Sequence, residues 1–248
     1  MRRLAGPFVI GALGTILAVR GTLPSPTTPD AALALGPVRL DSAASRLLFR
    51  SGFATLTVGT SWADGSVHGS WRDVYGGYGH VGIVRRGASR VLQEQPRAST
   101  RPDETHATMV VSRRSFGSLD LSVWVRTVRQ LRTPTPNPWE VAWVVWHYRD
   151  DTHFYDLVLK ANGWELGKED PAYPGAQRFL ATGSSPTFAP GRWYLVRVLQ
   201  AGDHITVWVN GARLVSVTDG QRPYLRGSLG LYTEDAQVQF GHVRVRWP

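Results

Sequence analysis

Apolar and polar residues alternate with a period of two along most of the second half of the chain. In one such stretch four apolar residues fall on the same face, namely Leu119, Leu121, Val123 and Val125. This alternation is typical of a strand with one buried and one exposed face. It recurs over residues 141–148, 154–160, 194–199, 205–209, 214–217, 228–232 and 238–245. No window shows a sustained 3.6-residue period, so we expect almost no helix.

Short turn signals separate these predicted strands. Asn162-Gly163 and Asn210-Gly211 each lie between two strand-like runs. An Asn-Gly pair tolerates the positive φ angles that both central residues of a type I′ turn require, so each pair predicts a hairpin. Asp150-Asp151-Thr152 and Ala201-Gly202-Asp203 separate two further strand pairs in the same way. Strands joined at short intervals by such turns predict an all-β fold of two packed antiparallel sheets.

The N-terminal residues differ from this pattern. Residues 1–21 combine Arg2 and Arg3 with an apolar stretch from Leu4 to Val19, which predicts an export signal or an N-terminal anchor. The stretch is shorter than the roughly twenty residues that a spanning helix needs, so export is favoured. Residues 22–37 form a Pro/Thr/Ala-rich linker, and residues 38–248 form one predicted domain. We therefore expect a secreted or cell-envelope protein with no further integral membrane segment.

Composition limits the chemistry that is available. The sequence has no Cys, and its 7 His residues are scattered without zinc-ligand spacing, so we expect no metal and no cofactor. A structural Ca²⁺ using Asp150-Asp151 or Glu234-Asp235 stays open, although turn formation explains these carboxylates more simply. The formal net charge of +9 favours anionic surroundings such as acidic glycans, although codon bias is an equal alternative. Nucleic acid is the least favoured partner because no recognised motif is present.

The segment from Gly191 to Trp247 resembles a known superfamily. It contains the motifs GRWYLV, ITVWVNG and GSLGLY and the closing strand FGHVRVRW. Their order resembles the C-terminal strands of concanavalin A-like jelly rolls, particularly laminin G-like domains and the 3-keto-disaccharide hydrolase family. The resemblance extends over residues 119–247 and implies a two-sheet antiparallel jelly-roll sandwich. Such folds host lectins, glycosidases, lyases and inert modules, so the resemblance implies no single activity.

Aromatic and titratable residues concentrate in residues 137–170. Aromatic rings stack on sugar rings while nearby polar groups fix their orientation, although most such tryptophans fill cores. We predict a carbohydrate site built from four residues, Trp143, His147, Lys160 and Glu165. Strand alternation places Trp143 and His147 on one face, which must then be the solvent-facing one. If that face packs into the core, the site would instead use Glu140, Trp146 and Tyr148.

Three classes of function follow from these features. The first is an exported carbohydrate-binding or glycan-associated module, with carbohydrate, including acidic polysaccharide, as the partner. The second is a sugar-active hydrolase or polysaccharide lyase on the same concave sheet, with candidate residues Glu140, Asp156, Glu165, His147 and Lys160. The third is a non-catalytic structural or protein-binding envelope domain. A further run, Arg126, Arg129 and Arg132, could engage an acidic glycan or phosphate, or form a solvated sheet edge.

Overall fold

The structure, a computed structural model, describes residues 46–248. The predicted export segment 1–21, the predicted linker 22–37 and the first residues of the predicted domain, 38–45, lie outside the described residues. Within the described part, no helix is long and apolar enough to cross a membrane. The only helical element there is a short 3₁₀ turn, η1 (Pro174–Ala176), so the expected scarcity of helix is confirmed.

Sixteen strands make up the described fold. They are β1 (Leu47–Ser51), β2 (Val67–His68), β3 (Trp71–Tyr75), β4 (His80–Arg86), β5 (Ser89–Gln95), β6 (Ala107–Phe116), β7 (Leu119–Gln130), β8 (Trp143–Asp150), β9 (His153–Lys160), β10 (Gly163–Glu169), β11 (Gln177–Gly183), β12 (Tyr194–Ala201), β13 (His204–Val209), β14 (Ala212–Thr218), β15 (Gly227–Glu234) and β16 (Ala236–Arg246).

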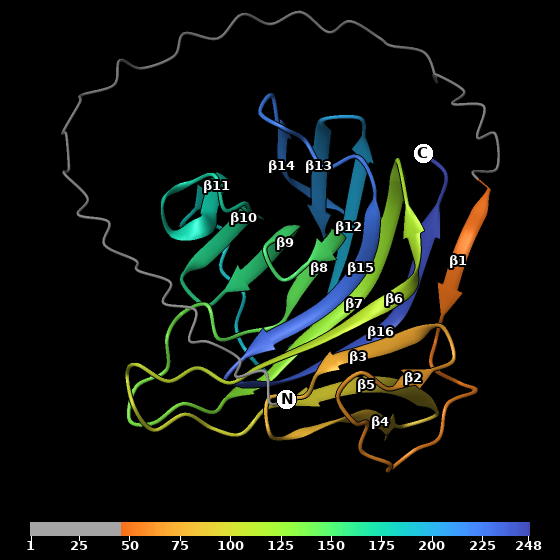
Figure 1. The fold of residues 1–248 in the computed structure, drawn as a ribbon, viewed down its shortest axis with the longest axis vertical. Helices are drawn as coiled ribbons and strands as arrows, with labels where there is room; N and C mark the ends of the chain where they lie inside the picture. Colours follow the sequence, from red (N-terminus) through yellow and green to blue (C-terminus); the bar gives the residue numbers. More distant parts are fainter. Residues whose placement is uncertain (1–45) are drawn as a thin grey trace, which may run out of the picture.

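The strands form two eight-stranded sheets that lie one behind the other (Figure 1). The β8 sheet has the order β11-β10-β9-β8-β15-β6-β3-β2. The β7 sheet has the order β14-β13-β12-β7-β16-β5-β4, with β1 paired to β16. The strands within each sheet pair in antiparallel register, as in β8 with β15 and in β7 with β16. The predicted all-β, two-sheet antiparallel jelly-roll sandwich is therefore confirmed.

The main core lies between the two sheets. Its buried side chains come from both sheets, with Val144, Trp146 and Leu157 on one side and Val123 and Val198 on the other. Trp146 also donates its indole N–H to Gln200 on β12, 2.7 Å away, which satisfies a polar atom inside the core. Trp146 is thus a core residue, and it does not share a face with Tyr148 as regular alternation predicted.

The two Asn-Gly pairs close hairpins in different ways. Asn210 and Gly211 have φ angles of 51° and 85° between the paired residues Val209 and Ala212, as a type I′ turn requires. In the other hairpin Lys160 pairs directly with Gly163, so the two loop residues are Ala161 and Asn162. Gly163 there has φ +136°, and a Cβ on it would lie 2.0 Å from a backbone oxygen of β11. This glycine is therefore needed for close strand packing rather than for the turn centre.

A second apolar cluster covers the outer face of the β8 sheet. Its buried members come from the strands of this sheet, except Val141, which lies two residues before β8, and they include Met109, Trp143, Val158 and Tyr232. Trp139 packs against it from the loop that precedes β8. The sheet therefore buries apolar side chains on both faces, and its outer face carries the polar groups described next.

Candidate functional site

Strand register gathers several predicted site residues on the outer face of the β8 sheet. Trp143 on β8 and Glu165 on β10 both pair with Val158 on β9, so all three side chains point to the same side. Tyr232 pairs with Trp143 on the other flank, and the two rings meet edge to face at 5.1 Å. Trp143 is only 3% exposed, so its main contacts are with this cluster.

Lys160 and Glu165 lie on the same outer face and form an ion pair. The Lys160 ammonium donates to Glu165, and the two side chains are 12% and 20% exposed. The hairpin between β9 and β10 holds them together, because Lys160 is the last residue of β9 and Glu165 is the third of β10. Three of the four predicted site residues, Trp143, Lys160 and Glu165, are therefore on one face of the sheet.

His147 lies apart from the other three. Its φ of 51° marks a bulge in β8, which removes it from the alternation. The ring is 1% exposed and its two nitrogens lie 2.6 Å from the Tyr224 carbonyl and 2.9 Å from the Gly117 carbonyl. Burial lowers the pKa of His147, although both carbonyl contacts oppose this. His147 thus links the segments that contain Gly117 and Tyr224 to β8 through its two ring nitrogens.

The bulge at His147 has a consequence for the next residue. A regular strand would turn Tyr148 away from Trp143, but the extra residue brings both into the same outer cluster. The bulge fits because β15 has a glycine opposite it: a Cβ on Gly227 would lie 2.3 Å from the His147 backbone. Tyr148 then stacks loosely on Phe154, with ring centroids 6.1 Å apart, and pairs in register with Ser228.

Acidic side chains form a second feature of this face. Asp156 pairs with Val145 and Gly167, and both of its carboxylate oxygens are buried without a hydrogen-bond partner. A Cβ on Gly167 would lie 2.6 Å from this carboxylate, so the glycine makes room for it. Burial raises the pKa of Asp156 well above its ordinary value, and the negative charge of Glu169 raises it further. Burial without a hydrogen-bond partner therefore favours the protonated form of Asp156.

Two neighbouring glutamates are shifted in the same direction. Burial, aided by the charge of Glu234, raises the pKa of Glu169 to about 8. Burial raises the pKa of Glu234 to about 7, although its hydrogen bond from Tyr232 acts against this. The outer face therefore carries carboxyl groups that hold protons near neutral pH, which is the state that a general acid requires.

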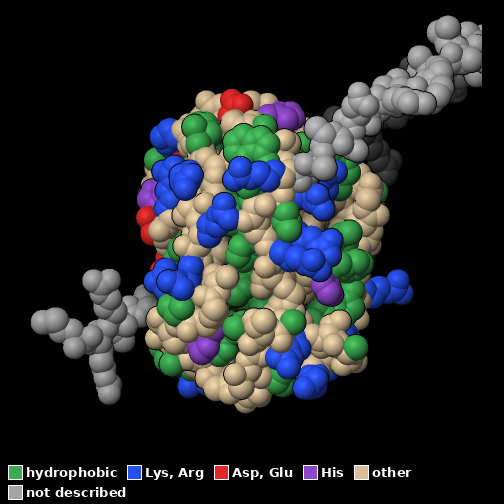
Figure 2. All heavy atoms as spheres, turned by 90° about the vertical axis from the view of Figure 1, so that its right-hand side faces the viewer, with side chains coloured by type: hydrophobic (Ala, Val, Ile, Leu, Met, Phe, Trp, Pro, Cys, Tyr) green, Lys and Arg blue, Asp and Glu red, His purple; other side chains and the backbone are tan. Residues whose placement is uncertain are grey.

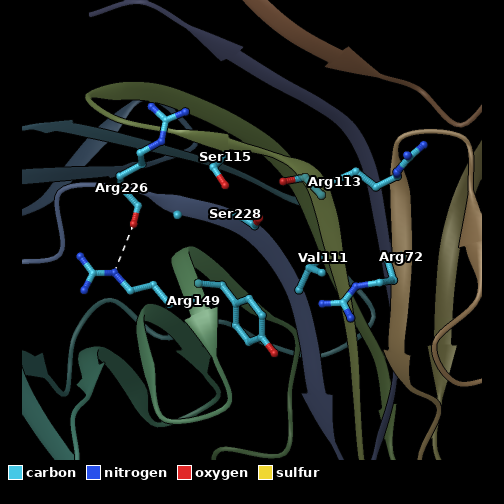
Figure 3. Close-up of a pocket in the computed structure, with 10 residues that line it drawn as sticks. Arg72, Val111, Arg113, Ser115, Arg149, Arg226 and Ser228 are labelled. Carbon is cyan, nitrogen blue, oxygen red and sulfur yellow. Dashed lines mark hydrogen bonds between the residues drawn. The ribbon is translucent and has the colours of Figure 1, made fainter.

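A hollow of about 500 Å³ opens on the same face, where β8, β15, β6 and β3 lie next to one another (Figure 3). It is lined by residues of β3, β6, β8 and β15 and by the residue before β15: Arg72, Val111, Ser112, Arg113, Ser115, Tyr148, Arg149, Arg226, Gly227 and Ser228. We call it the basic hollow because four of these residues are arginines. The arginines were not among the sequence-predicted site residues.

The arginine run predicted from the sequence does not line the basic hollow, which contains none of Arg126, Arg129 and Arg132. Arg132 is buried and donates to Glu140 and to Asp235, so it serves a structural network. Glu140, another candidate, is fully buried in that network and does not face the basic hollow.

The carboxylates considered for Ca²⁺ are engaged in hydrogen bonds within the protein. Asp235 accepts from Ser99, Asp150 from Thr152, and Asp151 from the Tyr148 hydroxyl. Within residues 46–248, no group of three or more His, Asp or Glu side chains is arranged to hold a metal ion.

Comparison with known proteins agrees with this architecture. Residues 58–246 match the model of a family described as the 3-keto-alpha-glucoside-1,2-lyase-like domain. The resemblance of the C-terminal motifs to the 3-keto-disaccharide hydrolase family is thereby confirmed. None of the curated proteins matches the sequence.

Several solved structures share the fold. The carbohydrate-binding module CBM66 from Bacillus subtilis is 14% identical, with a TM-score of 0.52 over 71% of this chain and 95% of the module. The beta-glucanase of Bacillus licheniformis is 10% identical, with a TM-score of 0.52 over 82% of this chain and 99% of the enzyme. A protein with a galectin-like fold from Bacillus subtilis is 12% identical, with a TM-score of 0.51 over 82% and 96% of the two chains. At these identities the likeness is one of fold.

Proposed function

The chain belongs to the family of 3-keto-alpha-glucoside-1,2-lyase-like domains, and on this premise we propose that it is an exported carbohydrate-binding domain. Its ligand would lie on the outer face of the β8 sheet, over the basic hollow. Export is proposed from the N-terminal sequence alone, and cell fractionation of the full chain tests it. Recovery only in the cytosol would contradict export and leave the binding proposal intact.

The observation that carries the binding proposal is the composition of the basic hollow. Sugars are recognised by an aromatic or apolar surface with a few polar groups that fix their orientation. The hollow combines Tyr148 and Val111 with the hydroxyls of Ser115 and Ser228 and with arginine donors. Two solved structures with this fold, a carbohydrate-binding module and a beta-glucanase, are named for carbohydrate, which supports the same class of ligand. A structural or protein-binding role is less favoured because this open hollow is present.

A second candidate function, catalysis on the same face, is favoured by the carboxyl groups of the outer face. Asp156 is buried with no hydrogen-bond partner, and Glu169 has a pKa of about 8. A carboxyl that keeps its proton at neutral pH can protonate a leaving oxygen, as glycoside hydrolysis or elimination requires. The ion pair between Lys160 and Glu165 adds a second titratable pair on this face.

A glycan array with the full-length protein tests the binding proposal, and Ser228→Trp locates the site. Ser228 lies in the hollow between Tyr148 and Ser115, so a tryptophan there fills the space. We expect this variant to lose glycan binding with little change in melting temperature. The matched control is Ser216→Trp on β14, an exposed serine of the other sheet, which should bind as the wild type does. Equal loss in both variants would contradict the assignment.

The same glycans separate binding from catalysis. Chromatography of each bound glycan after incubation shows whether it is cleaved. If it is cleaved, Glu169→Gln should abolish cleavage and leave binding unchanged, because the amide cannot donate the acidic proton and Glu169 is the partly exposed carboxyl of this group. Cleavage that survives this substitution would remove Glu169 from the reaction.

A further inference from the structure

The arginines of the basic hollow indicate which class of carbohydrate the hollow would bind. We propose that the ligand is an acidic oligosaccharide whose carboxylate or sulfate groups are held by Arg72 on one side of the hollow and by Arg149 and Arg226 on the other. This inference rests on the proposed function. Beyond the proposed binding of a carbohydrate, it specifies the charge and the minimum length of that carbohydrate.

Strand pairing explains why these arginines meet. Arg72 on β3 pairs with Val111 on β6, and Arg113 follows two positions later on the same face of β6. Arg149 ends the bulged part of β8, and Arg226 precedes β15, the strand between β8 and β6. In Figure 3 Arg72 lies beside Val111, whereas Arg149 and Arg226 lie at the opposite side, with Ser115 and Ser228 between them.

The positive charges of the hollow have no carboxylate partners. All four arginines are exposed, and none forms an ion pair within residues 46–248. Their polar contacts are with backbone oxygens at the limit of hydrogen bonding: Arg113 with Gly69 and Arg149 with Arg226, both at 3.4 Å. The Arg149 guanidinium also lies 4.9 Å from the centre of the Tyr224 ring. Several charges of one sign around one hollow, without counter-charges, attract an anion.

Two exposed arginines elsewhere in the described chain are neutralised. Arg197 pairs with Asp120 through two hydrogen bonds of 2.8 and 3.0 Å, and Arg222 pairs with Asp170 at 3.0 Å. These two arginines have carboxylate partners, whereas the four that surround the one hollow have none among residues 46–248. Guanidinium groups bind carboxylate and sulfate oxygens through parallel hydrogen bonds, so a ligand anion can replace the missing partner.

The spacing of the arginines indicates more than one sugar. Arg72 and Arg149 lie on strands that are three positions apart in the sheet, which corresponds to about 14 Å. This exceeds the width of a single hexose ring. A second hollow of about 710 Å³ shares Ser115 and Arg226 with the first.

The second hollow extends the same basic path. It adds Arg46, Arg114 and Trp247, and Trp247 is 58% exposed. Figure 2 shows one face of the molecule over which Lys and Arg side chains are spread, with acidic side chains only near its upper end and left edge. An extended acidic chain would find cations along the path and an aromatic ring at its end.

A glycan suits the hollow better than a nucleic acid does. Single-stranded nucleic acids bind where successive bases stack on exposed aromatic rings beside a basic groove. The first hollow has one aromatic residue, Tyr148, which is buried except for its edge and whose hydroxyl donates to Asp151. The serine hydroxyls between the arginines match the hydroxyl groups of a sugar.

Calorimetric titration of the full chain tests the inference. The probes are oligogalacturonate, its methyl ester, a sulfated heparin oligosaccharide, a neutral galactan oligosaccharide and oligo-deoxythymidine. We expect the uronate or the heparin oligosaccharide to bind at least tenfold more tightly than the two neutral probes, which corresponds to about 1.4 kcal/mol. Arg72→Gln and Arg226→Gln should each weaken this binding about tenfold, and 1 M salt should largely remove it.

The control is Arg213→Gln, which removes one exposed arginine at the far edge of the other sheet and should change affinity less than twofold. Tight binding of a neutral glycan that neither hollow variant affects would overturn the acidic ligand and leave the proposed function standing. Failure of every glycan to bind would overturn both. Equal binding of oligo-deoxythymidine would overturn the choice of a glycan.

Discussion

Arg132 and the arginines of the basic hollow are the same residue type in opposite surroundings. Arg132 is buried and donates to Glu140, to Asp235 at 2.8 Å and to the Arg101 carbonyl at 2.8 Å. Asp235 in turn accepts from the Ser99 hydroxyl at 2.5 Å. This network ties together the loops before β6 and before β8. The four arginines of the hollow are exposed and have no carboxylate partner among the described residues.

The difference separates two uses of positive charge. A buried cation must be paired, because leaving it or its partner unpaired costs several kcal/mol, so Arg132 holds the fold. An exposed arginine needs no partner for stability, so an unpaired group of them contributes little to folding. The net charge of +9 alone could not show this division. The hollow is a place where four such unpaired charges lie around one cavity and are available to a ligand.

Replacing Arg132 should have the largest effect on stability. Arg132→Gln leaves the carboxylates of Glu140 and Asp235 buried without their cation, and we expect a loss of about 3 to 5 kcal/mol. Urea unfolding with an unchanged m-value measures this loss. A loss below about 1 kcal/mol would mean that the two classes of arginine do not differ in the way described.

Trp143→Ala should have the next largest effect. Trp143 is buried in the outer cluster against Tyr232, so its truncation should cost about 3 kcal/mol, at the lower end for a tryptophan because the cluster can relax outward. Thermal unfolding and glycan titration of the same variant separate stability from contact with a ligand. If glycan binding is lost while the melting temperature stays constant, Trp143 is a ligand-contacting residue as the sequence predicted.

The acidic groups of the outer face predict a pH dependence of stability. The pKa of Glu169 is raised by burial to about 8 in the folded protein, so its contribution to stability is complete below its unfolded pKa and is lost as the pH rises through about 8. We expect the wild type to lose at least about 2 kcal/mol between pH 5 and 9. This is less than the full shift of Glu169 implies, because its side chain is only partly buried and water screens its charge, and the raised pKa of Glu234 adds to the loss. Glu169→Gln should flatten this profile. If the stability of Glu169→Gln falls with pH as steeply as that of the wild type, Glu169 is not the source of the pH dependence.

Arg226→Gln should have the smallest effect on stability. The substitution matches Arg132→Gln chemically but removes an exposed side chain without a partner, so we expect a change within about 0.5 kcal/mol. Thermal unfolding at low and high salt measures it. A loss comparable to that of Arg132→Gln would assign the hollow to folding and not to binding.

Much of the fold could be predicted because its signals are local. The alternation from Leu119 onward became β7, and Asn210-Gly211 became a type I′ turn. Strand alternation also placed Lys160 and Glu165 on one face correctly, since each lies close to the same hairpin. These predictions required only the side-chain period of a strand and the preferences of turn residues.

The rest of the site depends on contacts between distant strands. His147 left the predicted face because of a bulge that Gly227 accommodates, and these residues are 80 positions apart in the chain. The hollow's arginines come from separate strands, whose order in the sheet cannot be read from alternation. The one local signal was on β6, where Val111, Arg113 and Ser115 alternate toward the same face. This local pattern places Arg113 on a face of the sheet, but it does not show which residues of the neighbouring strands lie beside Arg113.

We infer that a glycan binds on the outer face of the β8 sheet and passes through the basic hollow. An NMR titration of the ¹⁵N-labelled full chain with oligogalacturonate tests it most directly. The account predicts that the amide signals of Ser115, Arg149, Arg226 and Ser228 shift together and saturate with one affinity, while those of β12, β13 and β14 stay in place. Shifts confined to β12, β13 and β14, with the signals of the hollow unchanged, would contradict it.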